Sequence, residues 1–223
     1  MCTSVVSWRP PLLDEEISHG CRNRAPVPGC GVGAATLLGA VGIGAGGGVA
    51  SADLLCGYST PAADLGAEVD AIKQLKASYF SNIDAKIWDG LRDLLAPDVV
   101  EDTTCSAGPI FYGRDPFIAF LQLTLGGAST HHQGYDPHIH LTSATTAEGL
   151  WTLEDVLIFG GTVGVHGYGH YNDRYAKVDG RWIVKYSKLT RTRLDLINPD
   201  GTVIQANAPI DVVVAAVKKV TGG

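Results

Sequence analysis

The chain has 223 residues, a hydrophobic share of 45% and a formal net charge of -6 at pH 7. This length allows one domain of ordinary size plus an appendage, and the hydrophobic share is sufficient for a buried core. The acidic balance argues against a nucleic-acid partner, because binding phosphates requires a basic face and the sequence has no Lys/Arg cluster with interleaved aromatic residues.

Residues 1–60 form a leader of unusual composition. Gly31 to Ala52 is an uncharged run rich in Gly, Ala, Val and Leu that ends in Ala-Ser-Ala, a pattern typical of signal-peptidase cleavage. The preceding segment is long and contains the acidic residues Asp14-Glu15-Glu16, whereas the start of a signal peptide is short and basic. A disordered leader and a signal cleaved after Ala52 both stay open, with a cytoplasmic location slightly favoured. The many glycines argue against stable membrane association.

After the leader, the sequence predicts helices first. Apolar residues at three- and four-residue intervals predict a first helix from Leu65 to Ile83, which Asp64 can cap. A short helix, a short strand and a third helix are then predicted at Ile87–Leu95, Val99–Thr103 and Asp115–Leu125.

Strands dominate the second half of the chain. Alternating apolar and polar residues, separated by glycines, predict four strands at His138–Ala144, Glu148–Phe159, Gly164–Val178 and Arg181–Arg193. The last two are joined by Asp179-Gly180, a strong hairpin signal. We therefore expect an α+β domain over residues 64–200, with the helices packed on one face of a curved antiparallel sheet, and a tail at residues 201–223.

Several motifs in this order resemble those of the SnoaL-like family in the nuclear-transport-factor-like superfamily, and within it scytalone dehydratase and the bile-acid dehydratases. They are Tyr79–Asp89 at the end of the first helix, Thr130-His131-His132 after the third, Gly167–Tyr171, and Tyr175–Trp182. The resemblance covers about Asp64 to Asp195. It implies a cone-shaped α+β barrel with a deep pocket, no cofactor, and association as a dimer or trimer.

The resemblance also implies the catalytic candidates. In the dehydratases a carboxylate at the end of the first helix faces a histidine that follows the third helix, and these positions match Asp84 and His132. The bile-acid dehydratases add a tyrosine five residues before the carboxylate, which is Tyr79 here. Ile83 stands where scytalone dehydratase has a tyrosine, so that enzyme's own substrate is not implied.

The substrate-binding candidates lie on the last two strands. Residues two apart on a strand share a face, so His166, Tyr168 and His170 form one polar stripe, which we expect to face the pocket. The bile-acid dehydratases also have an arginine on the last strand, and the resemblance implies that it matches either Arg191 or Arg193; the sequence does not decide between them.

These residues suit the elimination of water from a small hydroxy-ketone of polyketide, aromatic or steroid type, as in secondary metabolism. His132 would act as base and acid, Asp84 would orient its imidazole, and Tyr79 would donate to the enolate oxygen. A double-bond isomerase like ketosteroid isomerase, and a non-catalytic domain that binds small molecules or protein partners, are the alternatives.

A metal site is a competing interpretation of the histidines, because two histidines two apart on a strand can chelate one ion. His131 and His132 together with His138 and His140 would be the ligands, but no suitable glutamate is nearby. The helix-first order is also wrong for a jelly roll. We therefore predict neither a metal nor an organic cofactor, and the sequence has no nucleotide-binding loop in a suitable context.

Overall fold

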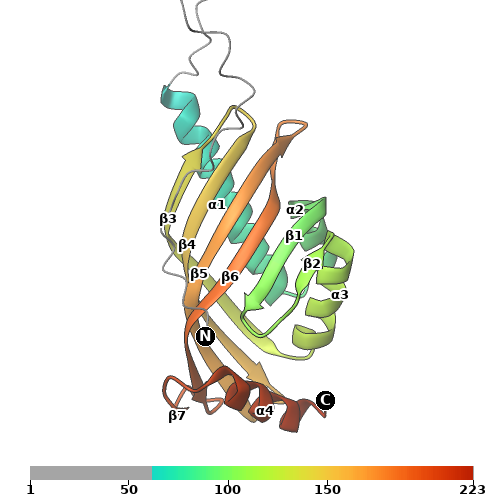
Figure 1. The fold of residues 1–223 in the computed structure, drawn as a ribbon, viewed down its shortest axis with the longest axis vertical. Helices are drawn as coiled ribbons and strands as arrows, with labels where there is room; N and C mark the ends of the chain where they lie inside the picture. The colour runs from blue at the N-terminus through green and yellow to red at the C-terminus, as the bar shows by residue number, and fades with distance from the viewer. Residues whose placement is uncertain (1–61, 223) are drawn as a thin grey trace, which may run out of the picture. The chain divides into compact units, whose positions relative to one another are not determined.

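The computed structural model describes residues 62–222, so the predictions made for residues 1–60 lie outside the described part (Figure 1). The elements follow in the order α1 (Ala62–Asp84), α2 (Trp88–Leu94), β1 (Leu95–Cys105), β2 (Ile110–Tyr112), α3 (Arg114–Leu125), β3 (Ser129–Leu141), β4 (Thr146–Phe159), β5 (Val163–Val178), β6 (Arg181–Ile197), β7 (Val203–Gln205) and α4 (Ile210–Thr221). Within residues 62–222, no helix has both the length and the apolar composition needed to cross a bilayer.

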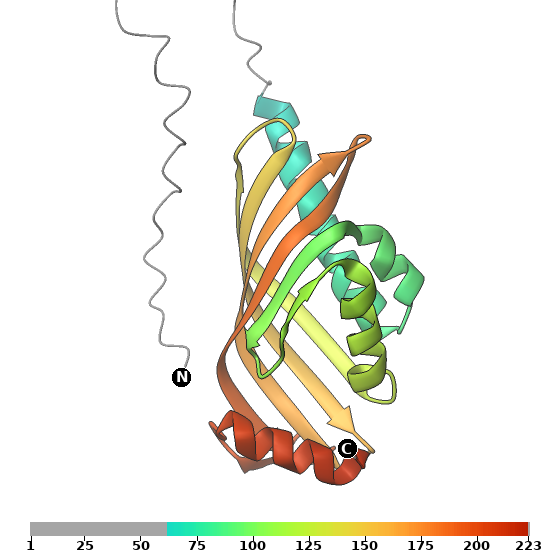
Figure 2. The same cartoon turned by 45° about the vertical axis from the view of Figure 1, so that its right-hand side comes forward.

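The strands form one sheet in the order β2-β1-β6-β5-β4-β3, with β7 paired to the end of β6. The long strands β3 to β6 are antiparallel neighbours, as the sequence predicted, whereas β1 runs parallel to β6. The sheet is strongly curved, and α1 lies along its concave side, with α2 and α3 beside β1 and β2 (Figure 2). This arrangement confirms the α+β class and the cone-like fold.

The apolar face of α1 supplies the centre of the main core. Ile72, Leu75, Tyr79 and Ile83 are buried at three- and four-residue spacing, and they pack against the inner face of the sheet. Burying these side chains removes their apolar surface from water, which is the largest favourable contribution to folding. The apolar spacing of α1 therefore places these side chains where their packing holds the helix against the sheet.

A second, smaller core lies at the other end of the long strands. It brings Phe159, Val165 and Leu196 together with Val213 of α4. The sequence predicted only a tail at residues 201–223. The structure instead contains β7 and α4 there, and α4 packs across the end of the sheet (Figure 1).

β3 is longer than its pattern indicated. The sequence predicted a strand from His138, but β3 begins at Ser129 and its pairing with β4 is interrupted by a register shift between Tyr135 and His138. Asp136, at the shift, has a positive φ of 48°, and a proline follows it. The bulge interrupts the apolar–polar alternation, and for this reason the pattern did not predict the first part of the strand. His131 and His132 therefore lie within β3 and not in a loop before it.

Candidate active site

Asp84, the last residue of α1, lies beside His132 of β3. The Nδ1 atom of His132 is 2.6 Å from Oδ1 of Asp84, and the backbone N–H of His132 donates to Oδ2 at 2.8 Å. The pair predicted from the sequence is therefore in direct contact. Because the carboxylate accepts the proton on Nδ1, the lone pair of the imidazole is on Nε2.

Neighbouring side chains hold this carboxylate in place. The hydroxyl of Thr130 donates to Asp84 Oδ1 at 2.9 Å, and the ammonium of Lys86 donates to the same hydroxyl oxygen at 2.8 Å. Burial alone would raise the pKa of Asp84, but the hydrogen bonds from His132 and Thr130 outweigh it and lower the pKa below its usual range. Asp84 is thus an anion at neutral pH.

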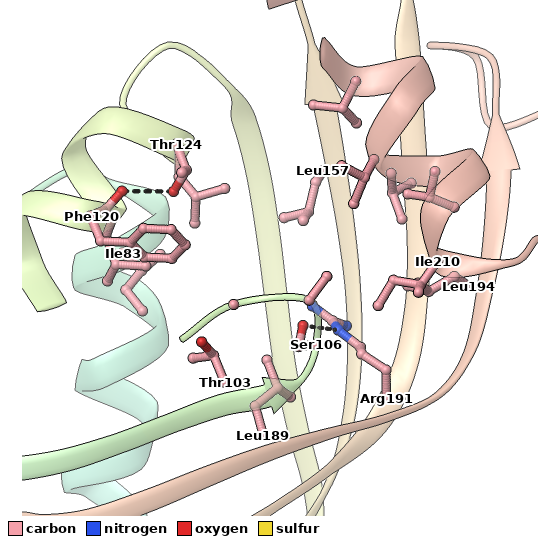
Figure 3. Close-up of a pocket in the computed structure, with 18 of the residues that line it drawn as sticks. Ile83, Thr103, Ser106, Phe120, Thr124, Leu157, Leu189, Arg191, Leu194 and Ile210 are labelled. Atoms are coloured by element: carbon pink, nitrogen blue, oxygen red, sulfur yellow. Dashed lines mark hydrogen bonds between the residues drawn. The ribbon is translucent and has the colours of Figure 1, made fainter. Parts of the chain in front are cut away.

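His132 forms part of the wall of a cavity of about 610 Å³ that is lined by α1, α3, α4, the inner face of the sheet and the segment after β1. Small-molecule sites commonly have volumes of roughly 300–1,000 Å³. Figure 3 shows Ile83 and Phe120 on one side and Leu157, Leu194 and Ile210 on the other. The lining is mainly apolar, so the cavity suits an uncharged organic molecule with few polar groups.

Tyr79 also lines this cavity, whereas Asp84 does not. Asp84 borders a separate hollow between α1 and β3, and His132 stands between the two spaces. The five-residue spacing along α1 places Tyr79 and Asp84 about 140° apart around the helix. This angle is compatible with a shared site, because Tyr79 lies on the cavity side of His132 and Asp84 on the opposite side. Burial, with a smaller effect of Glu101, raises the pKa of Tyr79 well above its usual value and keeps the phenol protonated.

Arg191, one of the two arginines left open by the sequence, is in the cavity wall. Its guanidinium forms a bidentate ion pair with Asp155 of β4, at 2.8 and 2.6 Å. Its Nε donates to the Ser106 hydroxyl at 3.3 Å (Figure 3). Asp155 Oδ2 also lies 3.9 Å from Nε2 of His132. A second carboxylate, compensated by an arginine, therefore lies near Nε2 of the histidine.

This ion pair needs a glycine in the neighbouring strand. A Cβ atom at Gly167 of β5 would collide with the Arg191 guanidinium and with the Asp155 carboxylate. Gly167 therefore leaves the space in which the two charged groups meet.

Arg193 has a different environment from Arg191. Half of its side chain is exposed (51%), and it pairs with Asp195 at 2.6 Å. The pairing of β5 with β6 shifts by one residue here, since Tyr168 lies opposite Arg193 and Gly169 opposite Arg191. This bulge places the two arginines on different faces of the sheet.

The polar stripe of β5 does not face the cavity, and this expectation was wrong. Val165 and Tyr171 line the cavity from β5, so the alternation of the strand places His166, Tyr168 and His170 on the opposite face. There His166 Nε2 is 2.7 Å from Glu154, and the Tyr168 hydroxyl is 3.2 Å from His166 Nδ1. All three side chains of the stripe are partly exposed to solvent, so their polar groups do not require a pocket.

Sequence reasoning missed two carboxylates of the inner wall. Asp155 lies in the predicted strand Glu148–Phe159, where its alternation with Leu153 and Leu157 places an acid on an otherwise apolar face. Glu101 lies at a polar position of the predicted short strand Val99–Thr103. In both cases the signal was a carboxylate at an inward position, which requires a partner or a ligand.

The comparisons with known proteins agree with this fold. The family model of the SnoaL-like domain matches residues 67–188. A protein from Novosphingobium aromaticivorans named as a scytalone dehydratase is 23% identical, with a TM-score of 0.55, covering 66% of this chain and 95% of its own. A variant of Rv3472 from Mycobacterium tuberculosis, a protein of unknown function, is 21% identical with a TM-score of 0.56, covering 74% of this chain and 91% of its own.

A third solved structure is a hexachlorocyclohexane dehydrochlorinase, LinA-type3, from Novosphingobium barchaimii. It is 15% identical with a TM-score of 0.55, and the match covers 60% of this chain and 93% of that protein. At these identities the three structures establish a shared fold. The family match spans more than half of the sequence and includes both Asp84 and His132, and on this basis the chain belongs to the SnoaL-like domain family.

Proposed function

We propose that this protein is a cofactor-independent lyase that eliminates water from a small, uncharged hydroxy-ketone of polyketide, aromatic or steroid type. The observation that carries the proposal is the pair formed by Asp84 and His132, with the imidazole in the wall of a mainly apolar cavity. A histidine so oriented can accept a proton and return it near neutrality. The named activities of the structural neighbours, a dehydratase and a dehydrochlorinase, are both eliminations and add support.

The proposed reaction has two proton transfers by one residue. His132 Nε2 removes a proton from the carbon next to the substrate carbonyl, and the electron pair of the C–H bond forms an enolate. The enolate then re-forms the carbonyl as the bond to the β-hydroxyl breaks, and His132 returns its proton so that water leaves. The products are the conjugated ketone and water, and the imidazole is neutral again.

The other residues stabilise the charges that appear along this path. Asp84 keeps the imidazole in the required tautomer and stabilises its protonated form. The phenol of Tyr79, kept protonated by burial, can donate to the enolate oxygen. Asp155, 3.9 Å from Nε2, adds to the stabilisation of the imidazolium, while Arg191 balances its charge before the reaction.

The test is an activity screen with the full chain, in the presence of a chelator, against aromatic and steroidal β-hydroxy-ketones. Absorbance of the conjugated product reports turnover, and thermal shift reports binding. We expect turnover in the wild type that is lost in His132→Ala. His140→Ala is the matched control, because His140 is an exposed histidine of the same strand and lines neither the cavity nor the hollow beside Asp84.

Three outcomes would contradict the proposal. Ligand-induced thermal shifts without turnover would identify a binding domain. A shifted double bond without loss of water would identify an isomerase. Activity abolished by the chelator would require a metal ion.

A further inference from the structure

Glu101 of β1 is a buried carboxylic acid in the cavity wall that the proposed reaction does not use. Its exposed fraction is 2%, it lines the cavity, and its Oε1 atom has no hydrogen-bond partner within the described residues. A buried polar atom without a partner costs free energy, so such atoms are rare in folded proteins. A ligand in the cavity can supply the missing hydrogen bond.

The surrounding charges leave Glu101 without a counter-ion of its own. The ammonium of Lys76 is fully buried and lies 2.8 Å from Oδ2 of Asp173, an ion-pair distance without hydrogen-bond geometry. The same ammonium is 3.7 Å from the centre of the Tyr171 ring. Ser187, near both acids, donates its hydroxyl proton to Asp173 at 2.8 Å. One buried cation and its carboxylate partner are therefore balanced, and a second anion would be uncompensated.

Protonation of Glu101 would remove this cost, because a neutral carboxyl group needs no counter-ion. Burial raises the pKa of Glu101 well above its usual value, and the nearby Lys76 ammonium and Ser187 hydroxyl oppose this rise without cancelling it. A neutral carboxyl group can both donate and accept a hydrogen bond. It therefore suits a hydroxyl or carbonyl oxygen better than an ammonium group.

The position of Glu101 in the sheet separates it from the histidine. Glu101 is on β1 and His132 is on β3, and β6, β5 and β4 lie between these strands in the sheet order. The cavity between them is mainly apolar. A molecule that satisfies both side chains has an oxygen function at each of two separated places on an apolar body.

We propose that Glu101 is a ligand-recognition residue, which forms a hydrogen bond through its uncharged carboxyl group with a second hydroxyl or carbonyl oxygen of a neutral ligand in the cavity. The inference concerns binding and selectivity. It holds whether the bound molecule is dehydrated, isomerised or only retained.

The experiment compares two fluorescent probes of the same size class with the full chain. The probe 6-acetyl-2-naphthol has an oxygen function at each end, and 2-acetylnaphthalene has one. In the wild type we expect the first probe to bind at least about fivefold more tightly. This ratio of dissociation constants corresponds to one hydrogen bond made to a buried group that otherwise has no partner. This preference should fall below about twofold in Glu101→Leu and persist in Glu101→Gln, whose amide also donates and accepts.

Additional measurements keep the result interpretable. Glu101→Met, whose unbranched chain fits the same space, repeats the test if Glu101→Leu fails to fold. The titrations are repeated in His132→Ala, so loss of turnover there does not affect the conclusion about Glu101. Absent binding of both probes to the wild type, or a preference that survives in Glu101→Leu and Glu101→Met, would overturn the proposal. Tightest binding of the cation formed by 2-(aminomethyl)naphthalene, lost in Glu101→Gln, would show that the acid is ionised and would overturn it too.

Discussion

One carboxylate, that of Asp84, binds His132 twice, through the ring Nδ1 at 2.6 Å and through the backbone N–H at 2.8 Å. The two contacts join the end of α1 to β3, so the same group positions a helix, a strand and an imidazole. Its removal should therefore affect both chemistry and stability, and the two effects can be measured separately.

The substitution Asp84→Asn tests the chemical role. An amide is similar in shape, but it cannot stabilise the imidazolium and can favour the wrong tautomer, so we expect kcat to fall on the order of 10³-fold. KM should change much less, because Asp84 does not line the cavity. The measurement is steady-state kinetics on the best substrate of the screen. Asp98→Asn, at an exposed ion pair with Lys185, is the control, and an equal loss there would contradict the assignment.

The stability role of Asp84 should depend on pH. Its pKa in the folded protein lies below the usual range, so between that value and about 4 the unfolded chain binds more protons than the folded one. The stabilisation is therefore present at neutral pH and is lost as pH falls. We expect the difference in free energy of unfolding between wild type and Asp84→Asn to shrink below about pH 4, where Asp84 itself becomes protonated. Urea unfolding between pH 3 and 7 measures it, and a difference independent of pH would refute this.

The two arginines of β6 should differ in their contribution to stability. Arg191→Met leaves the buried Asp155 without its partner, which typically costs about 3–5 kcal/mol. Arg193→Met removes a half-exposed ion pair and should cost about 1 kcal/mol or less. The double substitution Arg191→Met/Asp155→Leu should recover most of the loss, because no buried charge is left. Chemical denaturation of the four proteins measures these values, and no recovery in the double variant would count against a compensated pair.

Helix α4 should hold the end of the cavity through one buried side chain. Val213 is 6% exposed, whereas its neighbour Val212 is 37% exposed. Val213→Asp places a charge in the smaller core, so we expect α4 to lose hydrogen-exchange protection and ligand-induced thermal shifts to weaken. Val212→Asp should behave as the wild type. Unchanged protection of α4 in Val213→Asp would show that the helix is held by other contacts.

The parts of this structure that local patterns determine could be predicted from the sequence. The apolar spacing of α1 and the Asp179-Gly180 hairpin follow from residues close together in the chain, and both turn residues have positive φ, 49° and 78°. The contact between Asp84 and His132 was predicted only from the resemblance to the SnoaL-like family, which implies that these two positions face each other. No local pattern contains that contact, because the two residues are far apart in the sequence.

The orientation of strand residues could not be predicted in the same way. Alternation shows that His166 and Tyr168 share a face, but not which face of the sheet it is. The bulge that separates Arg191 from Arg193 depends on pairing with β5, which a single strand does not reveal. The missing hydrogen bond of Glu101 Oε1 likewise cannot be predicted from the sequence, because it depends on which described residues surround this atom in the folded structure.

The cavity is encoded in two stretches of the chain. The family match ends at residue 188, and it includes the histidine and its carboxylate. Arg191, Leu194, Ile210 and Val213 lie beyond it and form much of the opposite wall. The segment that matches the family model therefore does not contain the whole cavity wall, and substitutions after residue 188 can change the shape of the cavity without touching Asp84 or His132.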